Sequence, residues 1–521
     1  MSVLLTLATI LTLYGILTAL RIGSRDERLP PGPPTLPVIG NIHQVASKGL
    51  YRQMKKWGDK YGGVFSLKLA NATMVVLNDR EAIQELTEKR GALYSDRPLD
   101  EVVSIVGQHN FAFWDANALW RSERKVAAAA LSPSRLDGEL GLVQEAEVAM
   151  FIMDLLTTPD NFFFHIKRTV SSIANIIVWG FRASSYDDWW GHTVHDVSYI
   201  LFKFLEPGSY PPVGQLPFLR YLPDFLSPWK TRASQISQVI SDTWAEARRR
   251  LEARRLKGDK RSSLADRLLD GTQTMDLPLD TERENCFLGI LVEGGAETTA
   301  SSLETAFLFL AVHPEVQRKA RREIDQVCGP DRVPTWSDFS KLPYINCIIK
   351  ESLRIRPIAP LCFPHRVREN DWYRGMLIPK DSIIIIPTWA LHHDEDLYPD
   401  PETYNPDRFL GHPGLAPDYA GKGDPMTRDK LSSRRICPGI HVGERSLWHM
   451  IATTLWAFEI GPKTDPITGK TEDLDTSAYV ETLNHHPKPY EVDLKVRSEG
   501  HAETIKRKAA RASEFLSQFA E

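Results

Sequence analysis

A cysteine near the C-terminal end of the chain has surroundings suited to a thiolate. Cys437 is followed by Pro438-Gly439 and an apolar stretch, so it stands at the predicted N-terminus of a helix. Free backbone N–H groups and the helix dipole favour a thiolate over a thiol at such a position. Arg434 and Arg435 precede it and suit an anionic cofactor edge such as paired carboxylates. A structural cysteine in a basic loop explains this run equally well.

A second candidate site is an acid beside an alcohol in the most apolar internal segment, residues 289–309. Gly294, Gly295, Glu297 and Thr298 interrupt this predicted helix. Each glycine costs about 1 kcal/mol relative to alanine, and a buried acid costs more. Glycine lets a ligand approach the backbone closely, and an acid–alcohol pair can pass protons. The alternative is a bent helix whose Glu297 turns to solvent.

Two further polar patterns are less specific. Glu351 and Arg354 stand three residues apart on one face of a predicted helix, a spacing that is usual for solvated surface pairs. The His-rich stretch 391–396 superficially resembles a metal site. Adjacent histidines on a loop rarely bind one metal, so this stretch is interpreted as a polar connector.

Composition restricts the class of protein. The chain has 521 residues, enough for one large domain or for two to three ordinary ones. Its net charge of −4 argues against a nucleic-acid-binding protein. Five cysteines without C-x-x-C pairs argue against a disulfide framework or a zinc ribbon and indicate a thiol-reducing, cytosolic setting. The sequence has no phosphate-binding loop and no G-x-G-x-x-G, so the chain itself is not expected to hold a nucleotide.

The N-terminal sequence predicts a membrane anchor. Residues 3–20 carry no charge and are long enough for a short or tilted transmembrane helix. Arg21, Arg25 and Arg28 follow, which places the rest of the chain on the cytoplasmic side. A cleaved signal peptide is the alternative, but the basic residues follow the apolar run and no small-x-small cleavage site is evident. The proline-rich run 29–37 predicts a semi-rigid spacer.

The elements that would position the candidate sites are mostly helical. Two alternating apolar runs, 64–69 and 73–77, predict a β-hairpin. Helical periodicity then continues to about residue 355, apart from the proline-rich loop 207–228. That loop is interpreted as a substrate-channel lid, a second membrane contact or a plain surface connector. The charged tail 499–521 predicts a terminal helix that lies on the body.

Taken together, the motifs resemble those of one enzyme family. The chain is similar to the membrane-bound cytochromes P-450, which are haem-thiolate monooxygenases, from the predicted anchor to about residue 497. The motifs that carry the resemblance are, in order, the proline-rich hinge, W-x-x-x-R at 120–124, Gly-Gly-Ala-Glu-Thr-Thr at 294–299, His-Pro-Glu at 313–315, E-x-x-R at 351–354, Asn-Pro-Asp-Arg-Phe at 405–409 and Arg-Ile-Cys-Pro-Gly at 435–439. Each is weak alone, but their order and spacing are specific. Residues 364–366 and the tail look most like microsomal enzymes of filamentous fungi.

The resemblance implies a mainly α fold with small β-sheets, the cytochrome P-450 fold, with an N-terminal transmembrane helix. We expect a transmembrane anchor at 1–20, a proline-rich linker at 21–40, a haem-thiolate catalytic domain at 41–497 and a charged helical tail at 498–521. The protein would be single-pass in the endoplasmic reticulum membrane, with its catalytic domain in the cytosol.

The resemblance also implies roles for the two candidate sites. Cys437 would be the axial thiolate ligand of the iron of haem b, and it would push electron density onto the metal. Glu297 and Thr298 would deliver protons during oxygen activation, while Gly294 and Gly295 would leave room for oxygen. Loss of Thr298 is expected to uncouple oxygen reduction from product formation.

Other residues would hold the haem or the fold around it. The residues expected to bind the haem propionates are Trp120, Arg124 and Arg435, with His365 or Arg366. The residues expected to form a structural salt-bridge triad behind the haem are Glu351, Arg354 and Arg408. Electrons would come from NADPH through a separate NADPH–cytochrome P-450 reductase, with cytochrome b5 as a further partner.

The loop before Cys437 departs from the family pattern, which is Phe-Gly-x-Gly-Arg-x-x-Cys. Lys-Leu-Ser-Ser at 430–433 occupies the corresponding positions, and the segment after 426–429 is a few residues short. The family's glycines permit a tight backbone that aims N–H groups at the sulfur, and its aromatic residue covers the proximal side of the iron. Serine adopts positive φ less easily, and Lys430 would place a charge beneath the haem. The loop is either remodelled and functional, unable to support haem binding, or the product of a gene-model error.

The leading hypothesis is a monooxygenase that inserts one oxygen atom into a lipophilic small molecule, with secondary metabolism as the setting. One alternative is a catalytically impaired binding or scaffold protein, or a mis-spliced product, which the altered loop favours. Another is a haem-thiolate isomerase or dehydratase, against which the acid–alcohol pair argues. A secondary metabolite, a fatty acid or a steroid would each suit the expected substrate-facing residues, which are mostly apolar or aromatic. These residues are at 108–113, 201–205, 290–298, 359–363 and 477–480.

Overall fold

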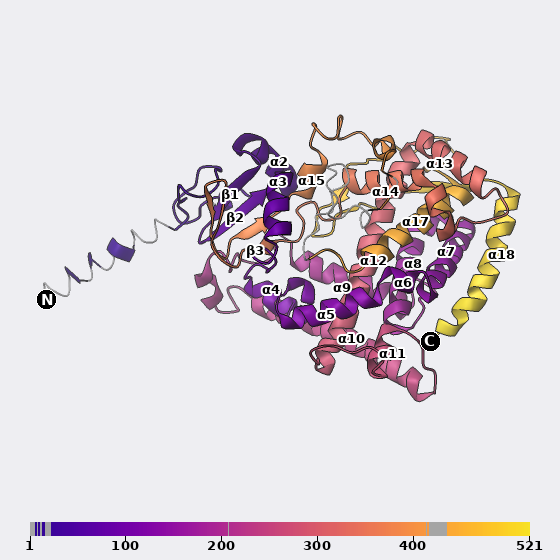
Figure 1. The fold of residues 1–521 in the computed structure, drawn as a ribbon, viewed down its shortest axis with the longest axis horizontal. Coiled ribbons are helices and arrows are strands. Elements are labelled where there is room, and N and C mark those ends of the chain that lie inside the picture. The colour runs from indigo at the N-terminus through magenta and orange to yellow at the C-terminus, as the bar shows by residue number, and fades with distance from the viewer. Residues whose placement is uncertain are drawn as a thin grey trace.

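The protein is mainly helical with small sheets, as the sequence predicts, and its four-stranded sheet lies toward one end (Figure 1). The computed structural model describes residues 22–415 apart from 207 and 413, residues 435–521, and residues 6, 7, 9, 10 and 13–15 of the N-terminal segment. Figure 1 shows β1, β2 and β3 beside α2 and α3 at the left of the view, with the other helices filling the centre and right. One large apolar core lies among these helices, and a smaller one lies beneath the sheet.

The longer helices are listed here with their bounds. They are α2 (Leu50–Tyr61), α5 (Ala118–Ala130), α7 (Glu139–Thr157), α8 (Phe162–Trp179), α9 (Trp189–Phe204), α10 (Trp229–Leu256), α12 (Thr281–Val312), α13 (Pro314–Val327), α14 (Pro343–Ile355), α17 (Ile440–Ala457) and α18 (Glu499–Leu516). Short helices connect them: α3 (Arg80–Ile83), α4 (Glu101–Val106), α6 (Pro133–Leu136), α11 (Leu264–Leu269) and α15 (Thr388–His392).

The strands form one four-stranded sheet and three pairs. Their bounds are β1 (Val64–Leu69), β2 (Ala72–Leu77), β3 (His365–Arg366), β4 (Asp371–Tyr373), β5 (Met376–Ile378), β6 (Ile383–Ile385), β7 (Phe458–Pro462), β8 (Tyr479–Val480), β9 (His486–Pro487) and β10 (Val492–Val496). The larger sheet has the order β1-β2-β6-β3. The predicted hairpin is confirmed, since β1 pairs antiparallel with β2 and Val64 stands opposite Leu77. The sheet also fixes β3, because His365 pairs with Ile384 of β6.

Helix α12 runs through the centre of the helical part (Figure 1). It begins after Asp280, whose carboxylate accepts a hydrogen bond from the backbone N–H of Arg283 at 2.8 Å. This N-cap satisfies one of the free donors at the helix start. The helix packs against α8, α9, α10 and α17. Most of its side chains are buried, as expected for a helix with neighbours on several sides.

The proline-rich segment after the predicted anchor lies against β1. Arg25 donates hydrogen bonds to the carbonyl oxygens of Pro30 at 2.9 Å and Ser66 at 2.8 Å. Ser66 in turn donates its backbone N–H to Pro31 at 2.8 Å. Prolines lack N–H groups, so their carbonyls are free to accept from a neighbouring strand edge. Part of the predicted spacer is therefore attached to the body.

No helix among the described residues is long and apolar enough to cross a membrane. The predicted anchor at residues 1–20 falls largely outside the described residues.

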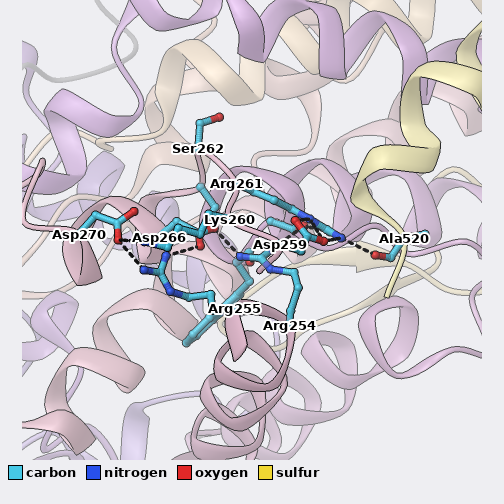
Figure 2. A network of polar contacts seen from close by, with 12 residues as sticks. Arg254, Arg255, Asp259, Lys260, Arg261, Ser262, Asp266, Asp270 and Ala520 are labelled. Atoms are coloured by element: carbon cyan, nitrogen blue, oxygen red, sulfur yellow. Dashed lines mark hydrogen bonds and ion pairs between the residues drawn. The ribbon is translucent and has the colours of Figure 1, made fainter. Parts of the chain in front are cut away.

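The C-terminal tail forms α18, which packs along α7, so the predicted terminal helix on the body is confirmed. Leu516 and Phe519 are buried with Val143 and Ile176 in an apolar cluster. The polar network of Figure 2 holds the last residues: Arg261 donates to the carbonyl oxygen of Ala520 at 2.7 Å. The same network contains buried ion pairs from Arg254 and Arg255 to Asp266, at 2.5 and 2.7 Å.

Candidate active site

Cys437 lies three residues before the first residue of α17, and it is exposed. Arg124 of α5 donates a hydrogen bond to the carbonyl oxygen of the preceding residue, Ile436. Burial lowers the pKa of Arg124, and the neighbouring Cys437 thiol opposes that shift. The unusual run 430–433 and Arg434 lie outside the described residues.

A basic cluster forms beside this cysteine. Trp120 and Arg124 stand one turn apart on α5, which is capped by Asn117 through a 2.8 Å bond from the N–H of Trp120. The guanidinium of Arg435 lies 4.3 Å from the centre of the Trp120 ring. Burial, followed by the nearby charge of Arg97, lowers the pKa of Arg435 to about 9. The structure thus brings the predicted residues Trp120, Arg124 and Arg435 together around Ile436 and Cys437.

The two adjacent residues of β3 have different surroundings, as alternation along a strand requires. His365 is buried, and burial together with the charges of Arg97 and Arg435 lowers its pKa to about 3. Its Nδ1 atom is buried and has no hydrogen-bond partner among the described residues. Arg366 instead forms ion pairs with Asp115 and Asp381, each at 2.6 Å. The basic cluster therefore contains His365, whereas Arg366 is engaged with carboxylates.

Arg97 is a member of the cluster that the sequence analysis missed. Its side chain is 8% exposed and donates to the carbonyl oxygens of Ala112 and Pro364, each at 2.7 Å. Burial lowers its pKa to about 10. Within the described residues neither Arg97 nor Arg124 forms an ion pair with a carboxylate. The sequence around Arg97, Ser-Asp-Arg-Pro, carries no spacing that marks it as part of a site.

The middle of α12 is open although its neighbours are buried. Gly294 is exposed, and a Cβ built on it would meet no atom within 4 Å, while one on Gly295 would lie 3.5 Å from Ala174. Thr298 is half-buried and donates its hydroxyl to the carbonyl oxygen of Gly294 at 2.7 Å. These residues, with Glu297, form an open stretch on a buried helix, a place where a ligand can approach the backbone.

Glu297 does not turn to bulk solvent. Its side chain is 14% exposed, and Oε2 lies 2.5 Å from Nδ1 of His195 on α9. The other ring nitrogen of His195 is 2.9 Å from the hydroxyl of Ser171 on α8. Burial acts to raise the pKa of Glu297, but the hydrogen bond and charge of His195 outweigh it, and the pKa is lowered. The acid is thus held ionised within a Ser171–His195–Glu297 chain.

The cysteine region and the open stretch meet where α17 packs against α12. Gly443, six residues after Cys437, is close enough that an added Cβ would lie 3.8 Å from the hydroxyl of Thr299. Thr299 directly follows Thr298. The thiol and the acid–alcohol pair are therefore positioned by two helices in mutual contact.

Glu351 and Arg354 are not the solvated pair that their spacing alone suggests. Both are buried on α14, and Arg354 Nε lies 2.6 Å from Glu351 Oε2. Arg408 Nε is 3.5 Å from Glu351 Oε1, which also accepts from the N–H of Asn405 at 2.8 Å. The structure brings these three charged residues together.

The His-rich run is also not the polar connector that was predicted, because part of it forms α15 and is buried. His393 Nδ1 lies 2.8 Å from the carbonyl oxygen of Trp389, and burial lowers its pKa to about 2. His392 Nδ1 lies 3.2 Å from the carbonyl oxygen of Arg354. Both histidines thus contribute to packing and hydrogen bonding beside α14.

These residues fit a haem group. An exposed cysteine at the start of α17 offers the axial ligand that a thiolate supplies. Arg97 is buried and Arg124 is half-buried, and neither has a carboxylate partner in the described part of the chain, so both suit an anionic group such as a propionate. The orphaned Nδ1 of His365 supplies a further polar contact, and the Gly294 backbone can be approached closely.

Comparison with known proteins agrees with this fit. The family model for cytochrome P450 matches residues 30–492. The chain is 38% identical over 511 residues to the cytochrome P450 monooxygenase macC of Penicillium terrestre, covering 95% of each chain. It is 37% identical over 520 residues to the cytochrome P450 monooxygenase yanC of Aspergillus niger, covering 95% of this chain and 94% of the relative. The chain therefore belongs to the cytochrome P450 family of haem-thiolate monooxygenases, which are oxidoreductases that incorporate oxygen.

Proposed function

We propose that this protein is a membrane-anchored monooxygenase that inserts one oxygen atom from O2 into a lipophilic small molecule of secondary metabolism. The observation that carries the proposal is the basic cluster beside Cys437, in which Arg97 and His365 are buried and Arg124 and Arg435 are half-buried. A cluster of this kind has a large desolvation cost unless an anionic group is bound. The similarity to monooxygenases of filamentous fungi supports secondary metabolism as the setting.

In this proposal the chain holds haem b through side chains from separate elements. Cys437 is the axial ligand, and the bound haem supplies the oxygen-activating chemistry. Arg97, Arg124 and Arg435 bind the propionates by charge-assisted hydrogen bonds, together with the imidazole of His365. Trp120 supports Arg435 through its ring. Arg366 is not included, because Asp115 and Asp381 already neutralise it.

The open stretch of α12 receives oxygen and supplies protons. Gly294 and Gly295 leave room because they carry no side chain. Thr298 holds a proton on Oγ1, which forms a hydrogen bond to the carbonyl oxygen of Gly294 in this structure. The carboxylate of Glu297 can accept a proton and return it. The triad of Glu351, Arg354 and Arg408 has a structural role in this proposal, since its charges are satisfied by one another and by backbone groups.

Members of this family take electrons from a redox partner and act on lipophilic substrates. For this chain we propose an NADPH–cytochrome P450 reductase, which binds the NADPH, and cytochrome b5 as a further electron donor. The absence of a nucleotide-binding motif from the sequence is consistent with a separate reductase.

We further propose a single-pass arrangement in the endoplasmic reticulum membrane. Residues 1–20 form the anchor, 21–40 the linker, 41–497 the cytosolic catalytic domain and 498–521 the helical tail. The surface of the proline-rich loop supports a second membrane contact, because Leu222 is 36% exposed there and four other large apolar side chains are exposed still further. They are Phe218, Tyr221, Phe225 and Leu226, at 61%, 82%, 84% and 63%.

The altered loop before Cys437 supports an alternative function, that of a catalytically impaired protein with the same fold. A carbon monoxide difference spectrum of the dithionite-reduced protein in membranes separates the two functions. The monooxygenase requires a long-wavelength Soret band that is retained in Cys328→Ser and lost in Cys437→Ser. A wild-type protein without that band would contradict the proposal. Sequencing the transcript across residues 426–437 then distinguishes an impaired enzyme from a gene-model error.

A further inference from the structure

A cavity beside α12 has a polar wall to which the oxidation chemistry assigns no role. It lies where the loop after α4 meets α9, α10 and α12. Leu201 and Ile290 contribute apolar lining. The polar side chains that line it are Gln108, His109, Asn110, Ser237, Ser241 and Glu293. The sequence predicts a mostly apolar wall at 108–113, 201–205 and 290–298, whereas this cavity has a substantial polar share.

Glu293 has one carboxylate oxygen fixed and the other available. The side chain is 8% exposed, and Oε1 accepts a hydrogen bond from the indole N–H of Trp244 at 2.9 Å. Oε2 accepts no hydrogen bond from the described residues. Burial raises the pKa of Glu293 to about 7, against the effect of the Trp244 bond. A buried acid with a free oxygen in a cavity wall is costly unless a ligand completes its hydrogen bonding.

The cavity adjoins the open stretch of α12. Ile290 and Gly294 are four residues apart, on one side of the helix, and Glu293 directly precedes Gly294. Glu293 also stands one turn before Glu297, a separation of about 6 Å along the helix axis. A molecule that lies over Gly294 can therefore reach Glu293 with a polar group while its reactive part faces the acid–alcohol pair.

The residues that line the cavity indicate which polar group of a substrate would fit it. No lysine or arginine is among the residues that line the cavity in the described structure, and His109 is placed 3.5 Å from the carboxylate of Glu282. A substrate carboxylate would therefore lie unpaired beside Glu293. The serine and amide side chains both donate and accept, as in the 3.1 Å bond from Gln108 Nε2 to Ser237. A hydroxyl group, which also does both, satisfies this wall in either protonation state of the acid.

We propose that this cavity binds a hydroxyl group of the substrate, with Glu293 Oε2 as its hydrogen-bond partner, so that the enzyme selects hydroxylated lipophilic molecules. The inference rests on the proposed function in that the same molecule is oxidised over the open stretch of α12. Trp244 and Glu293 then act as specificity residues: the indole fixes one oxygen, and the substrate hydroxyl takes the other.

Calorimetric titration of the haem-loaded full-length protein with 2-naphthol and its methyl ether, 2-methoxynaphthalene, tests this inference. The methyl ether has a methyl group in place of the hydroxyl hydrogen, so it can accept but not donate, and a hydrogen bond to a buried carboxylate should favour the naphthol about tenfold. Glu293→Gln should bring the two affinities within about twofold. Its amide oxygen must face Trp244, so the NH2 group donates to a hydroxyl and to an ether oxygen alike. Glu304→Gln is the matched control, because Glu304 is a buried acid of the same helix outside the cavity lining.

Equal affinities in the wild-type protein, or a preference retained in Glu293→Gln, would overturn the assignment. So would tighter binding of the cationic 2-(aminomethyl)naphthalene than of the naphthol. Glu293→Met provides a second variant, which removes both oxygens and should also abolish the preference. Calorimetry does not depend on the haem spectrum. A wild-type protein that has the carbon monoxide band but does not prefer the naphthol would therefore contradict hydroxyl binding in the cavity and leave the monooxygenase proposal intact. A missing band with retained selectivity counts against the monooxygenase alone.

Discussion

Single residues in this protein owe their chemical properties to partners far away in the chain. Glu297 belongs to α12 and His195 to α9, 102 residues earlier, yet their side chains lie 2.5 Å apart. Ser171 of α8 extends the chain through the other imidazole nitrogen. Lys167, also on α8, adds a positive charge that favours ionised Glu297. The acid of the acid–alcohol pair is therefore connected to two other helices, which fixes its orientation and would supply a proton relay for the role proposed for Glu297.

Replacement of His195 by alanine should raise the pKa of Glu297. The native pKa is depressed, so ionised Glu297 stabilises the fold above its ordinary pKa, and this contribution is lost as pH falls through the native value. Without His195 the ionised form requires a higher pH. The ratio of product formed to NADPH consumed should therefore begin to fall at a higher pH, on the acid side of its pH profile, than in the wild-type protein. His192→Ala, on the same helix but more exposed, should leave the profile unchanged. Identical profiles for both variants would contradict the relay.

At the scale of elements, buried ion pairs fix helices that carry no part of the site. Glu351 of α14 accepts from Arg354 and from the N–H of Asn405, and Arg408 lies 3.5 Å away. Arg354 also donates to the carbonyl oxygen of His392 at the end of α15. The triad thus joins α14, α15 and the segment around residue 405, because each charge would be costly if left alone in this buried place.

Glu351→Gln should destabilise the protein by about 3–5 kcal/mol, since it leaves Arg354 buried without its counter-charge. Urea unfolding followed by far-UV circular dichroism measures the loss. The matched control is Glu503→Gln, which removes an exposed pair with Lys506 and should produce no measurable change. Equal midpoints for the two variants would show that the triad is not structural.

The C-terminal helix makes a separate contribution, because α18 lies outside the residues that the family model matches. Leu516 is fully buried in the cluster between α18 and α7. Leu516→Ala should lower the free energy of unfolding by about 3 kcal/mol through the cavity it leaves. Gln518→Ala, at an exposed position, should cost nothing measurable. Below its unfolding midpoint Leu516→Ala should keep a normal carbon monoxide band, and loss of the band in the folded variant would show that the tail also shapes the haem site.

For the whole molecule, the distribution of exposed apolar side chains bears on how it meets a membrane. The loop at 207–228 places Tyr221 and Phe225 at 82% and 84% exposure, where a protein surrounded by water on every side has little reason to place them. Such rings suit the boundary between lipid and water. If the proposed anchor and this loop both contact the membrane, the two contacts would fix the orientation of the catalytic domain.

Removal of residues 1–21 should therefore leave part of the protein bound to phosphatidylcholine vesicles in a flotation assay. Adding Tyr221→Ser and Phe225→Ser to the truncated protein should release most of it, because the remaining apolar contact is lost. The control adds Ile467→Ser, which removes a single apolar side chain exposed at 93% in a turn, and should float like the truncated parent. Equal flotation of the two variants would exclude the loop as a membrane contact.

The sequence by itself determined the family and the residues whose roles depend on local order. Cys437 before a helix, the acid–alcohol pair between glycines and E-x-x-R on one helix face are short-range patterns, and their order along the chain is specific. The hairpin at β1 and β2 and the terminal helix were also predictable, because two-residue and helical periodicities are local properties.

Only the tertiary structure decided which side chains meet. It placed His365 in the basic cluster and Arg366 among carboxylates, added Arg97, and gave Glu297 its partner His195. It also buried Glu351, Arg354, His392 of α15 and the adjacent His393, whose sequence patterns had suggested solvent. Each of these outcomes depends on contacts between segments far apart in the chain. Burial and charge compensation arise only when those segments pack, and no pattern along the sequence records them.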